Sequence, residues 1–187
     1  MKKLEFGIDC DEVLAEFRNS AFDLIKNLTG RSYSKSDMTE WDMEKFLKKE
    51  ESSLMWDFIN ESPNFIKSIK PCEGAKEAIG QLKNYGDIFI ITAPIHKCHN
   101  FMLKRNKWLL RHFNIEPKNI IYAKAKYLVN VDLFIDDHPD NIEKWVERNK
   151  KGKAILWSQP YNNFEIPGSI RTDNWNIVID IVKNQLR

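Results

Sequence analysis

The sequence predicts an α/β fold: a Rossmann-like parallel sheet flanked by helices, with a small helical cap inserted after the first strand. Short apolar runs, such as residues 4–9, alternate with longer stretches of helical periodicity, which is typical of a parallel sheet with right-handed crossovers. Residues 31–70 differ, because they contain frequent serines and charged side chains and no strand pattern. We therefore predict an α/β core over residues 1–14 and 71–187 and a helical cap over residues 15–70.

The first strand is predicted over residues 4–9, because a mostly apolar run ends abruptly at the carboxylate of Asp9. Residues 13–28 then place apolar side chains at helical spacing, and Gly30 follows them where a helix commonly ends. In the segment 31–70, aromatic side chains recur without the alternation of a strand. We interpret this segment as helical.

More strands and helices are predicted after residue 70. Apolar runs predict strands over residues 87–93, 119–123, 131–135 and 153–157. We expect the last of these to be the final strand of the sheet. Apolar side chains at helical spacing predict helices over residues 75–85, 96–113, 139–149 and 175–186. Gly86 is expected to cap the first of these helices, and Trp108, Trp145 and Trp175 are assigned to the core.

The composition is that of an ordinary globular protein. The chain has 187 residues, of which 42% are hydrophobic and 30% are charged, and its net charge is +2. A charge so close to neutral does not favour a polyanion, so no stable nucleic-acid partner is expected, and no apolar run is long enough to span a bilayer. The three cysteines form no close pairs, which favours a reducing cytoplasm over a disulfide or zinc framework. A homodimer remains open.

Polar side chains follow three of the predicted strands at the point where each strand ends. These side chains are Asp9 and Asp11, Thr92, and Asp136 and Asp137. Because the carboxyl ends of parallel strands meet at one edge of a sheet, we expect these side chains to converge on one crevice. Several carboxylates in one pocket would repel one another strongly without a cation. An all-oxygen set of ligands suits Mg²⁺.

Positive charge near the same edge would let the pocket hold a phosphate dianion as well, and Lys124 or Lys126 is the candidate. Each polar residue also has an ordinary structural explanation. The first two aspartates are compatible with a solvated turn, the later aspartate pair with a helix N-cap, and a lone threonine with common loop chemistry. Their common register at one sheet edge favours catalysis.

The order and spacing of these residues resemble the motifs of the haloacid-dehalogenase superfamily of phosphohydrolases: Asp9-Cys10-Asp11-Glu12-Val13, then Thr92, then a lysine, then Asp136-Asp137. The chain resembles one branch, the 5'(3')-deoxyribonucleotidases, more closely. The features that resemble this branch are Asp-x-Asp-x-Val-Leu-Ala-x-Phe at 9–17, Asn64-Phe65, Pro-x-x-Gly-Ala at 71–75, Thr-x-Pro-Ile at 92–95, Trp108 and Asp-Leu-x-Ile-Asp-Asp at 132–137. The resemblance covers most of the chain.

This resemblance implies a two-step mechanism. Asp9 would attack phosphorus and form an aspartyl-phosphate, and Asp11 would protonate the leaving alcohol and then activate water. Mg²⁺ would be held by the Asp9 carboxylate, the backbone carbonyl of Asp11 and the pair Asp136-Asp137, so that an anionic carboxylate can approach an anionic phosphate. Cys10, between the two aspartates, is interpreted as a packing residue rather than a nucleophile.

The resemblance also implies a phosphate site. Thr92 and the backbone at Ala93 would hydrogen-bond phosphate oxygens, and Lys126 would neutralise charge that develops during transfer. Lys126 is preferred to the lysine two positions earlier because its separation from Asp136 matches the family lysine. Arg105 stands where the family carries another lysine, and we expect a second phosphate contact there.

The cap implied by the resemblance would close over the site and exclude water. Its aromatic side chains would offer flat apolar faces to a nucleobase. Phe17 and Phe65 match the base-pocket positions of the family, whereas Trp41 and Trp56 are candidates by composition alone.

Two positions depart from the family pattern. Glu12 replaces the glycine that commonly follows the second aspartate, and Ala93 replaces a serine seen in some relatives. These departures affect the substrate more than the reaction. The sequence therefore predicts a cytoplasmic, Mg²⁺-dependent phosphomonoesterase that acts on (deoxy)ribonucleoside monophosphates. The alternatives are a phosphatase of another small phosphate ester and a nucleotide-binding homologue without turnover.

Overall fold

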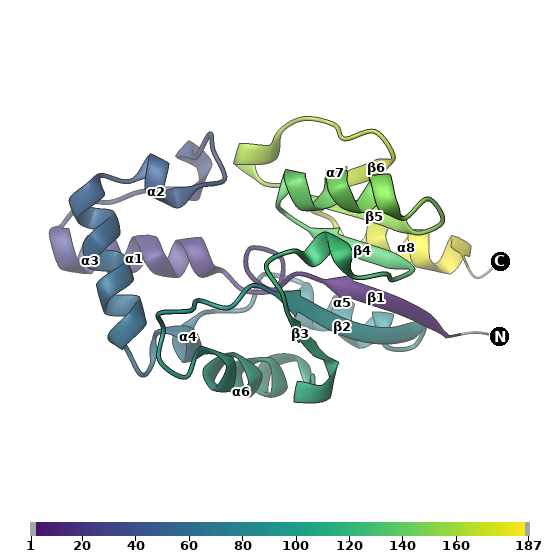
Figure 1. Cartoon of the computed structure of the whole chain (residues 1–187), viewed down its shortest axis with the longest axis horizontal. Helices are drawn as coiled ribbons and strands as arrows, with labels where there is room; N and C mark the ends of the chain where they lie inside the picture. The colour runs from purple at the N-terminus through teal and green to yellow at the C-terminus, as the bar shows by residue number, and fades with distance from the viewer. Residues whose placement is uncertain (1–2, 186–187) are drawn as a thin grey trace.

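The computed structural model describes residues 3–185, and its strands form one sheet in the order β3-β2-β1-β4-β5-β6 (Figure 1). Every neighbouring pair is parallel, so a crossover must return the chain to the same end of the sheet each time. The predicted α/β fold is therefore confirmed. The strands are Leu4–Ile8 (β1), Gly86–Thr92 (β2), Ile120–Tyr122 (β3), Leu133–Asp136 (β4), Lys153–Trp157 (β5) and Ser169–Thr172 (β6).

Helices cover both faces of the sheet, and α-helices lie in the crossovers from β1 to β2, β2 to β3 and β4 to β5. They are Phe17–Thr29 (α1), Met43–Phe46 (α2), Lys49–Glu61 (α3), Phe65–Ser68 (α4), Ala75–Leu82 (α5), Phe101–Phe113 (α6), Pro139–Arg148 (α7) and Trp175–Gln185 (α8). Successive residues of a strand point to opposite faces, and Ile90 and Ile91 accordingly belong to different apolar clusters. On the Ile91 side, Trp145 of α7 stacks on Phe134 with ring centroids 5.5 Å apart. The other cluster takes side chains from α5, α6 and α8.

The segment from Phe17 to Ser68 contains helices α1 to α4 and no strand, and α1, α2 and α3 stand to one side of the sheet, at the left of Figure 1. The chain enters and leaves this segment through two connections that run side by side. The Glu16 amide donates to the Lys70 carbonyl at 2.9 Å, and the Cys72 amide donates to the Leu14 carbonyl at 2.8 Å. The helical segment is thus attached to the rest of the chain at one place.

Two predictions about the elements are wrong. The strand over residues 153–157 is not the last, because β6 pairs with β5 at the sheet edge; its sequence, Ser-Ile-Arg-Thr, has no apolar run and is mostly half-buried or exposed. Gly86 does not cap α5, which ends at Leu82, but begins β2. A Cβ at Gly86 would lie 2.5 Å from the Leu4 carbonyl oxygen, so the glycine permits β2 to approach β1 closely.

The other predicted elements are present with shifted ends. The helix expected over 13–28 begins at Phe17, because the residues before it form a tight turn in which the amides of Leu14 and Ala15 donate to the Cys10 carbonyl. The helix expected from residue 96 begins at Phe101. The predicted last residue of the final helix, 186, lies outside the described residues. Gly30 ends α1 in the left-handed conformation as expected, with φ 76°, and Trp108, Trp145 and Trp175 are buried as predicted.

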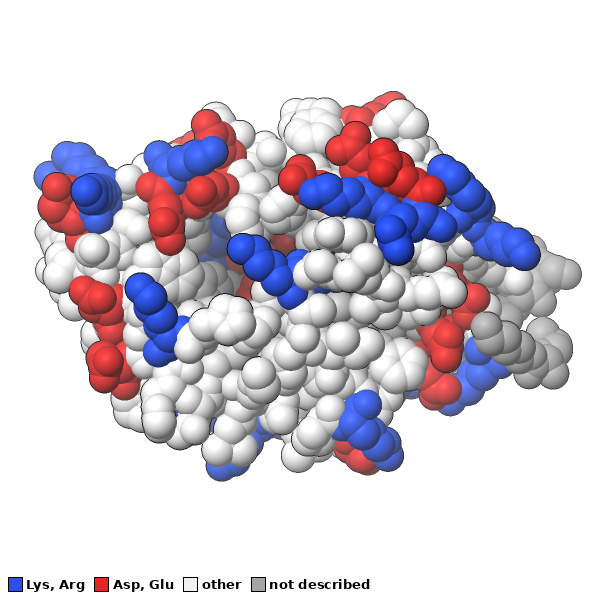
Figure 2. Space-filling view, viewed as in Figure 1, with Lys and Arg blue, Asp and Glu red and all other residues white. Residues whose placement is uncertain are grey.

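Charged side chains of both signs are interspersed over the face seen in Figure 2, where blue and red groups often lie side by side. Some of them form exposed ion pairs, such as Lys45 with Glu40 and Lys144 with Asp140. Among residues 3–185, none of the helices combines the length and the apolar character that crossing a bilayer requires.

Candidate active site

The candidate site lies where three neighbouring strands end. Asp9 directly follows β1, Thr92 is the last residue of β2, and Asp136 is the last residue of β4. The chain proceeds from β1 to β2 and β3 in one direction and then crosses to β4 on the other side of β1. The gap between β1 and β4 is therefore a topological switch point, the place where open α/β sheets bind their ligands.

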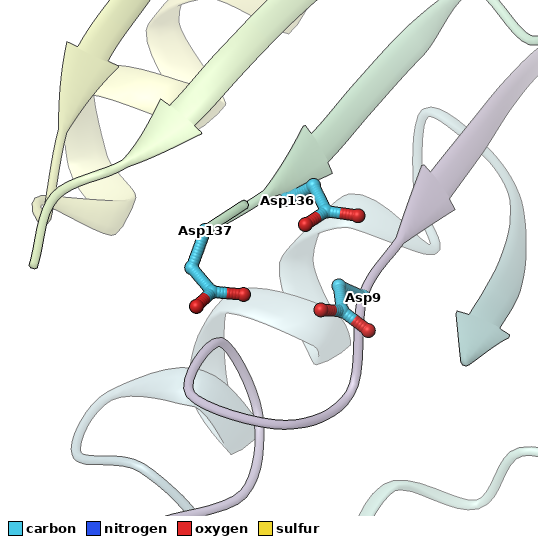
Figure 3. Close-up of side chains that lie close together, drawn as sticks. All are labelled: Asp9, Asp136 and Asp137. Carbon is cyan, nitrogen blue, oxygen red and sulfur yellow. The ribbon is translucent and has the colours of Figure 1, made fainter. Parts of the chain in front are cut away.

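Three carboxylates gather at this switch point. Asp9, Asp136 and Asp137 each offer an oxygen within 4.8 Å of the others and point toward one another from the ends of β1 and β4 (Figure 3). They are 3%, 0% and 3% exposed. Burial raises the pKa of Asp9 and of Asp136; Lys126 opposes this shift and neighbouring carboxylates add to it. A divalent cation would offset the cost of this cluster, and its all-oxygen donor set fits Mg²⁺.

Lys126 is the lysine that meets the carboxylates. It belongs to the 3₁₀ turn Lys126–Leu128, and its Nζ lies 2.6 Å from Asp9 Oδ1 and 3.2 Å from Asp136 Oδ2. Lys124, the alternative, is exposed. Burial alone would lower the pKa of Lys126, but Asp136 and Asp9 outweigh it and raise that pKa above its ordinary value. The lysine is therefore held charged beside the nucleophile candidate.

Arg105 lies behind Asp11 rather than at the cavity wall. Its Nη2 donates to Asp11 Oδ1 at 2.6 Å and its Nη1 donates to Cys10 Sγ at 3.1 Å, and the side chain is fully buried. The guanidinium also lies over the rings of Phe101 and Trp108. The phosphate contact expected for Arg105 came from the family resemblance, and a helical position does not reveal which neighbour a long side chain will reach. By this geometry Arg105 orients the Asp11 carboxylate.

The Asp11 side chain stands apart from the carboxylate cluster. It is 30% exposed, and its contact is with Arg105 rather than with the three clustered aspartates. Cys10, next to it, is buried, and burial raises the pKa of its thiol against the opposing effect of Arg105. A thiol in this state is a poor nucleophile.

Thr92 presents a hydroxyl without a protein partner. Its Oγ1 is buried and takes part in no hydrogen bond with any described residue. An unpaired buried hydroxyl is costly, and a bound oxyanion would satisfy it. Ala93, the next residue, lines the cavity beside the site.

A cavity of about 1250 Å³ opens beside these residues. Helix α3 and the segment before it form one wall, and the loops after β2, β3 and β4 form the other. The first wall includes Trp41, Trp56 and Asn60, and the second includes Ala93, Lys124, Lys126 and His138. Trp56 Nε1 and Asn60 Oδ1 are buried there without a partner among the described residues. Both residues line the cavity, but these two polar atoms are themselves sealed from solvent.

The cap aromatics divide into two pairs. Phe17 and Phe65 pack edge-to-face, with centroids 5.7 Å apart, and neither is among the described residues that line the cavity. Trp41 and Trp56 line the cavity, and the ring centroids of Trp41 and His138 lie 4.2 Å apart. The ring of Phe17 lies 6.2 Å from that of Trp56. The tryptophans, which were candidates by composition alone, therefore line the cavity.

Sequence reasoning missed Tyr161 and Arg18. The Tyr161 hydroxyl donates to Asp137 Oδ2 at 2.5 Å, and Arg18 Nη1 donates to that hydroxyl at 2.7 Å. Tyr161 lies in the 3₁₀ turn Pro160–Asn162, directly after β5. Its position after a predicted strand, at the same edge as the aspartates, was the one signal that pointed to it.

Solved structures define the class of fold. A haloacid dehalogenase-like family hydrolase from Streptococcus pneumoniae superposes with a TM-score of 0.60 over 96% of this chain and 98% of its own, at 11% identity. At that identity the likeness concerns the fold, which is that of the haloacid-dehalogenase-like hydrolases.

Sequence comparison defines the family. The model for "5' nucleotidase, deoxy (Pyrimidine), cytosolic type C protein" matches residues 3–186, and the chain belongs to this family. It is 29% identical over 167 residues, 88% of this chain and 87% of the relative, to a 5'(3')-deoxyribonucleotidase of Clostridium acetobutylicum. It is 23% identical over 176 residues, 94% of this chain and 95% of the relative, to that of Bacillus subtilis. The protein is a phosphoric monoester hydrolase, and the resemblance found in the sequence is confirmed.

Proposed function

We propose that the protein is a Mg²⁺-dependent phosphatase of (deoxy)ribonucleoside monophosphates that works through an aspartyl-phosphate on Asp9. The proposal rests on the pairing of a buried carboxylate cluster with Lys126, beside a cavity of about 1250 Å³. Relatives described as 5'(3')-deoxyribonucleotidases support the substrate class.

Asp9 is the proposed nucleophile. Its Oδ1 accepts from the Cys10 amide at 2.6 Å and faces Lys126 Nζ at 2.6 Å. None of the hydrogen bonds among residues 3–185 engages its Oδ2, which is therefore the oxygen available to attack phosphorus. In the first step the Oδ2–P bond forms and the bond from phosphorus to the ester oxygen breaks. In the second step water attacks phosphorus and restores the carboxylate.

Asp11 is the proposed acid and base. It would give a proton to the departing ester oxygen and then take one from the attacking water. Arg105 holds Oδ1 of Asp11 at 2.6 Å, which leaves the other oxygen for these transfers. Because Arg105 donates to the carboxylate from a fully buried position, it fixes the direction in which Asp11 points.

Mg²⁺ would be held by Asp9, Asp136 and Asp137, with the backbone carbonyl of Asp11 implied by the family resemblance, and it would reduce the repulsion between carboxylate and phosphate. Around the phosphate, the Thr92 hydroxyl and the backbone at Ala93 would donate hydrogen bonds. Lys126 would balance the charge that develops on the transferred group.

The cap is proposed to comprise residues 15–70, and the core residues 1–14 and 71–187. The two side-by-side connections near Ala15 and Pro71 support these boundaries. Trp41 and Trp56, which line the cavity, would offer their flat faces to the base. Three cysteines without a disulfide fit the reducing cytoplasm, where we propose that the enzyme acts.

A phosphatase of another small ester is the second candidate. The observation that favours it is that Phe17 and Phe65, which match the base-pocket positions of the family, are not among the described residues that line the cavity. A homologue without turnover is disfavoured, because every catalytic position is filled.

The test is a hydrolysis screen of nucleoside monophosphates, deoxy and ribo, 5' and 3', with sugar phosphates alongside, each with and without Mg²⁺. We expect phosphate release from deoxynucleotides that stops when divalent cations are removed. Release without any divalent cation would contradict the metal requirement. Turnover of sugar phosphates with none of nucleotides would favour the second candidate.

A further inference from the structure

Tyr161 makes a directional bond to a carboxylate of the proposed metal site. Its hydroxyl lies 2.5 Å from Asp137 Oδ2 and 2.7 Å from Arg18 Nη1. A guanidinium can only donate, so the Tyr161 oxygen accepts from Arg18 and its single proton must go to Asp137. The carboxylate is therefore held through one oxygen. None of the hydrogen bonds within the described part of the chain ends on its Oδ1.

The backbone of Asp137 is fixed by a different residue. Asn162 Nδ2 donates to the Asp137 carbonyl and to the Trp157 carbonyl, each at 2.8 Å. Asn162 thus positions the main chain, and Tyr161 positions the carboxylate. Removing the Tyr161 hydroxyl should allow the Asp137 carboxylate to rotate while the Asp137 backbone stays in place.

Arg18 brings the helical segment into this arrangement. It is the second residue of α1, is 6% exposed, and its Nη1 lies 3.5 Å from Asp137 Oδ2. Its Nη2 donates to the Trp41 carbonyl at 2.6 Å, and its guanidinium lies 4.3 Å from the ring centre of Tyr161. The Trp41 ring packs against His138, the residue after Asp137. Arg18 therefore touches the cavity wall and the metal-site carboxylate at once.

Glu12 anchors Arg18. Its Oε1 accepts from the Arg18 amide at 2.6 Å, and its Oε2 lies 3.2 Å from Lys35 Nζ. Its own carbonyl accepts from Gln159 Nε2 at 2.9 Å, beside the turn that holds Tyr161. Glu12 adopts φ 64° and is 2% exposed. The residue that departs from the family pattern is thus the junction between Arg18 and the loop after β5.

We propose that Arg18 and Tyr161 are positioning residues that orient the Asp137 carboxylate toward the divalent cation, so that the seating of the helical segment and the metal site depend on each other. The inference rests on the metal requirement of the proposed function. Partners of this kind commonly contribute about 10- to 100-fold in metal affinity.

The first test is Tyr161→Phe, which removes one hydroxyl and keeps the ring. MgCl₂ is titrated into the metal-free protein by calorimetry, and thermal unfolding is recorded without metal. We expect the Mg²⁺ dissociation constant to rise at least about tenfold, and the substrate KM at saturating Mg²⁺ to stay near the wild-type value. The matched control is Tyr33→Phe, which removes a phenol that donates to Glu51 within the helical segment and should leave Mg²⁺ binding unchanged.

The second test is Arg18→Met, alone and combined with Tyr161→Phe. If Arg18 and Tyr161 act through the same series of hydrogen bonds, the Mg²⁺ dissociation constant of the double variant should be close to the larger of the two single-variant values. Arg18→Lys serves if Arg18→Met does not fold, and should lie between wild type and Tyr161→Phe. Wild-type Mg²⁺ affinity in Tyr161→Phe would overturn the positioning role alone. A wild-type protein that binds no Mg²⁺ would overturn the proposed function and this inference together.

Discussion

The sheet edge and the cap side of the cavity hold their functional side chains differently. At the sheet edge, Asp9, Asp136 and Asp137 are almost sealed from solvent, and each is bonded to Lys126 or Tyr161. On the cap side, the two cavity tryptophans are partly accessible to solvent. Buried charges require fixed partners, whereas a surface that selects a ligand can stay open. The difference fits the proposed division of roles, in which the core performs the chemistry and the helical segment selects the ester.

The largest expected effect is at the nucleophile. Asp9→Asn should lower kcat by about 10⁴-fold or more on every phosphate ester, because the proposed covalent intermediate forms on the Asp9 carboxylate. Initial rates on a deoxynucleoside monophosphate and on an aryl phosphate measure it. Asp173→Asn, at an exposed position, is the control. A variant that turns over either substrate at the wild-type rate would refute the nucleophile assignment.

The next effect is at Lys126. Lys126→Met should lower kcat by about 10²- to 10³-fold, again on all esters, because the charge beside the transferred group is lost. Lys124→Met, the matched change at the exposed lysine, should lower kcat far less. The comparison of the two variants in one assay decides between the lysines, and the reverse order of effects would show that the wrong one has been chosen.

The two possible roles of Arg105, contact with the phosphate and orientation of Asp11, predict different kinetics. Arg105→Met should lower kcat by about 10- to 100-fold with little change in KM, since the guanidinium orients the acid and base rather than the substrate. Arg111→Met, on the exposed side of the same helix, is the control. A rise in KM with kcat preserved would restore the phosphate role expected from the sequence.

The smallest and most selective effect is on the cap. Trp56→Phe should raise KM for deoxynucleotides about three- to tenfold, because a smaller aromatic face remains beside the base, and should leave an aryl phosphate unaffected. Phe65→Leu should alter both substrates alike, because Phe65 does not line the cavity. If Phe65→Leu raised KM for nucleotides alone and Trp56→Phe did not, the phenylalanines and not the tryptophans would form the base pocket.

The same difference explains which features were predictable. Asp9, Thr92 and Asp136 end strands whose register is set by backbone bonds, so their convergence follows from the order of elements along the chain. The partner of Arg105 depends on how a helix packs, which spacing does not encode. Tyr161 lies in a loop after β5, with no strand-end carboxylate to mark it.

Fold predictions failed for related reasons. Strand β6 is short and lies at the sheet edge, so its residues bury little and show no apolar run. Gly86 stands where a helix cap was expected, but its lack of a Cβ serves the approach of β2 to β1. The sequence also could not show which aromatic rings face the cavity. Phe17 and Trp56 belong to one cluster, and only three-dimensional packing decides which of them lines the cavity.

Phosphorylation of Asp9 during turnover would leave a record in the stereochemistry at phosphorus. The wild-type enzyme would hydrolyse a nucleoside thiophosphate, made chiral by isotopic labelling of its oxygens, in water of a third oxygen isotope. Two in-line displacements, first by Asp9 and then by water, each invert phosphorus, so we expect overall retention in the released thiophosphate. Overall inversion would mean that water attacks the substrate directly and that Asp9 is not phosphorylated.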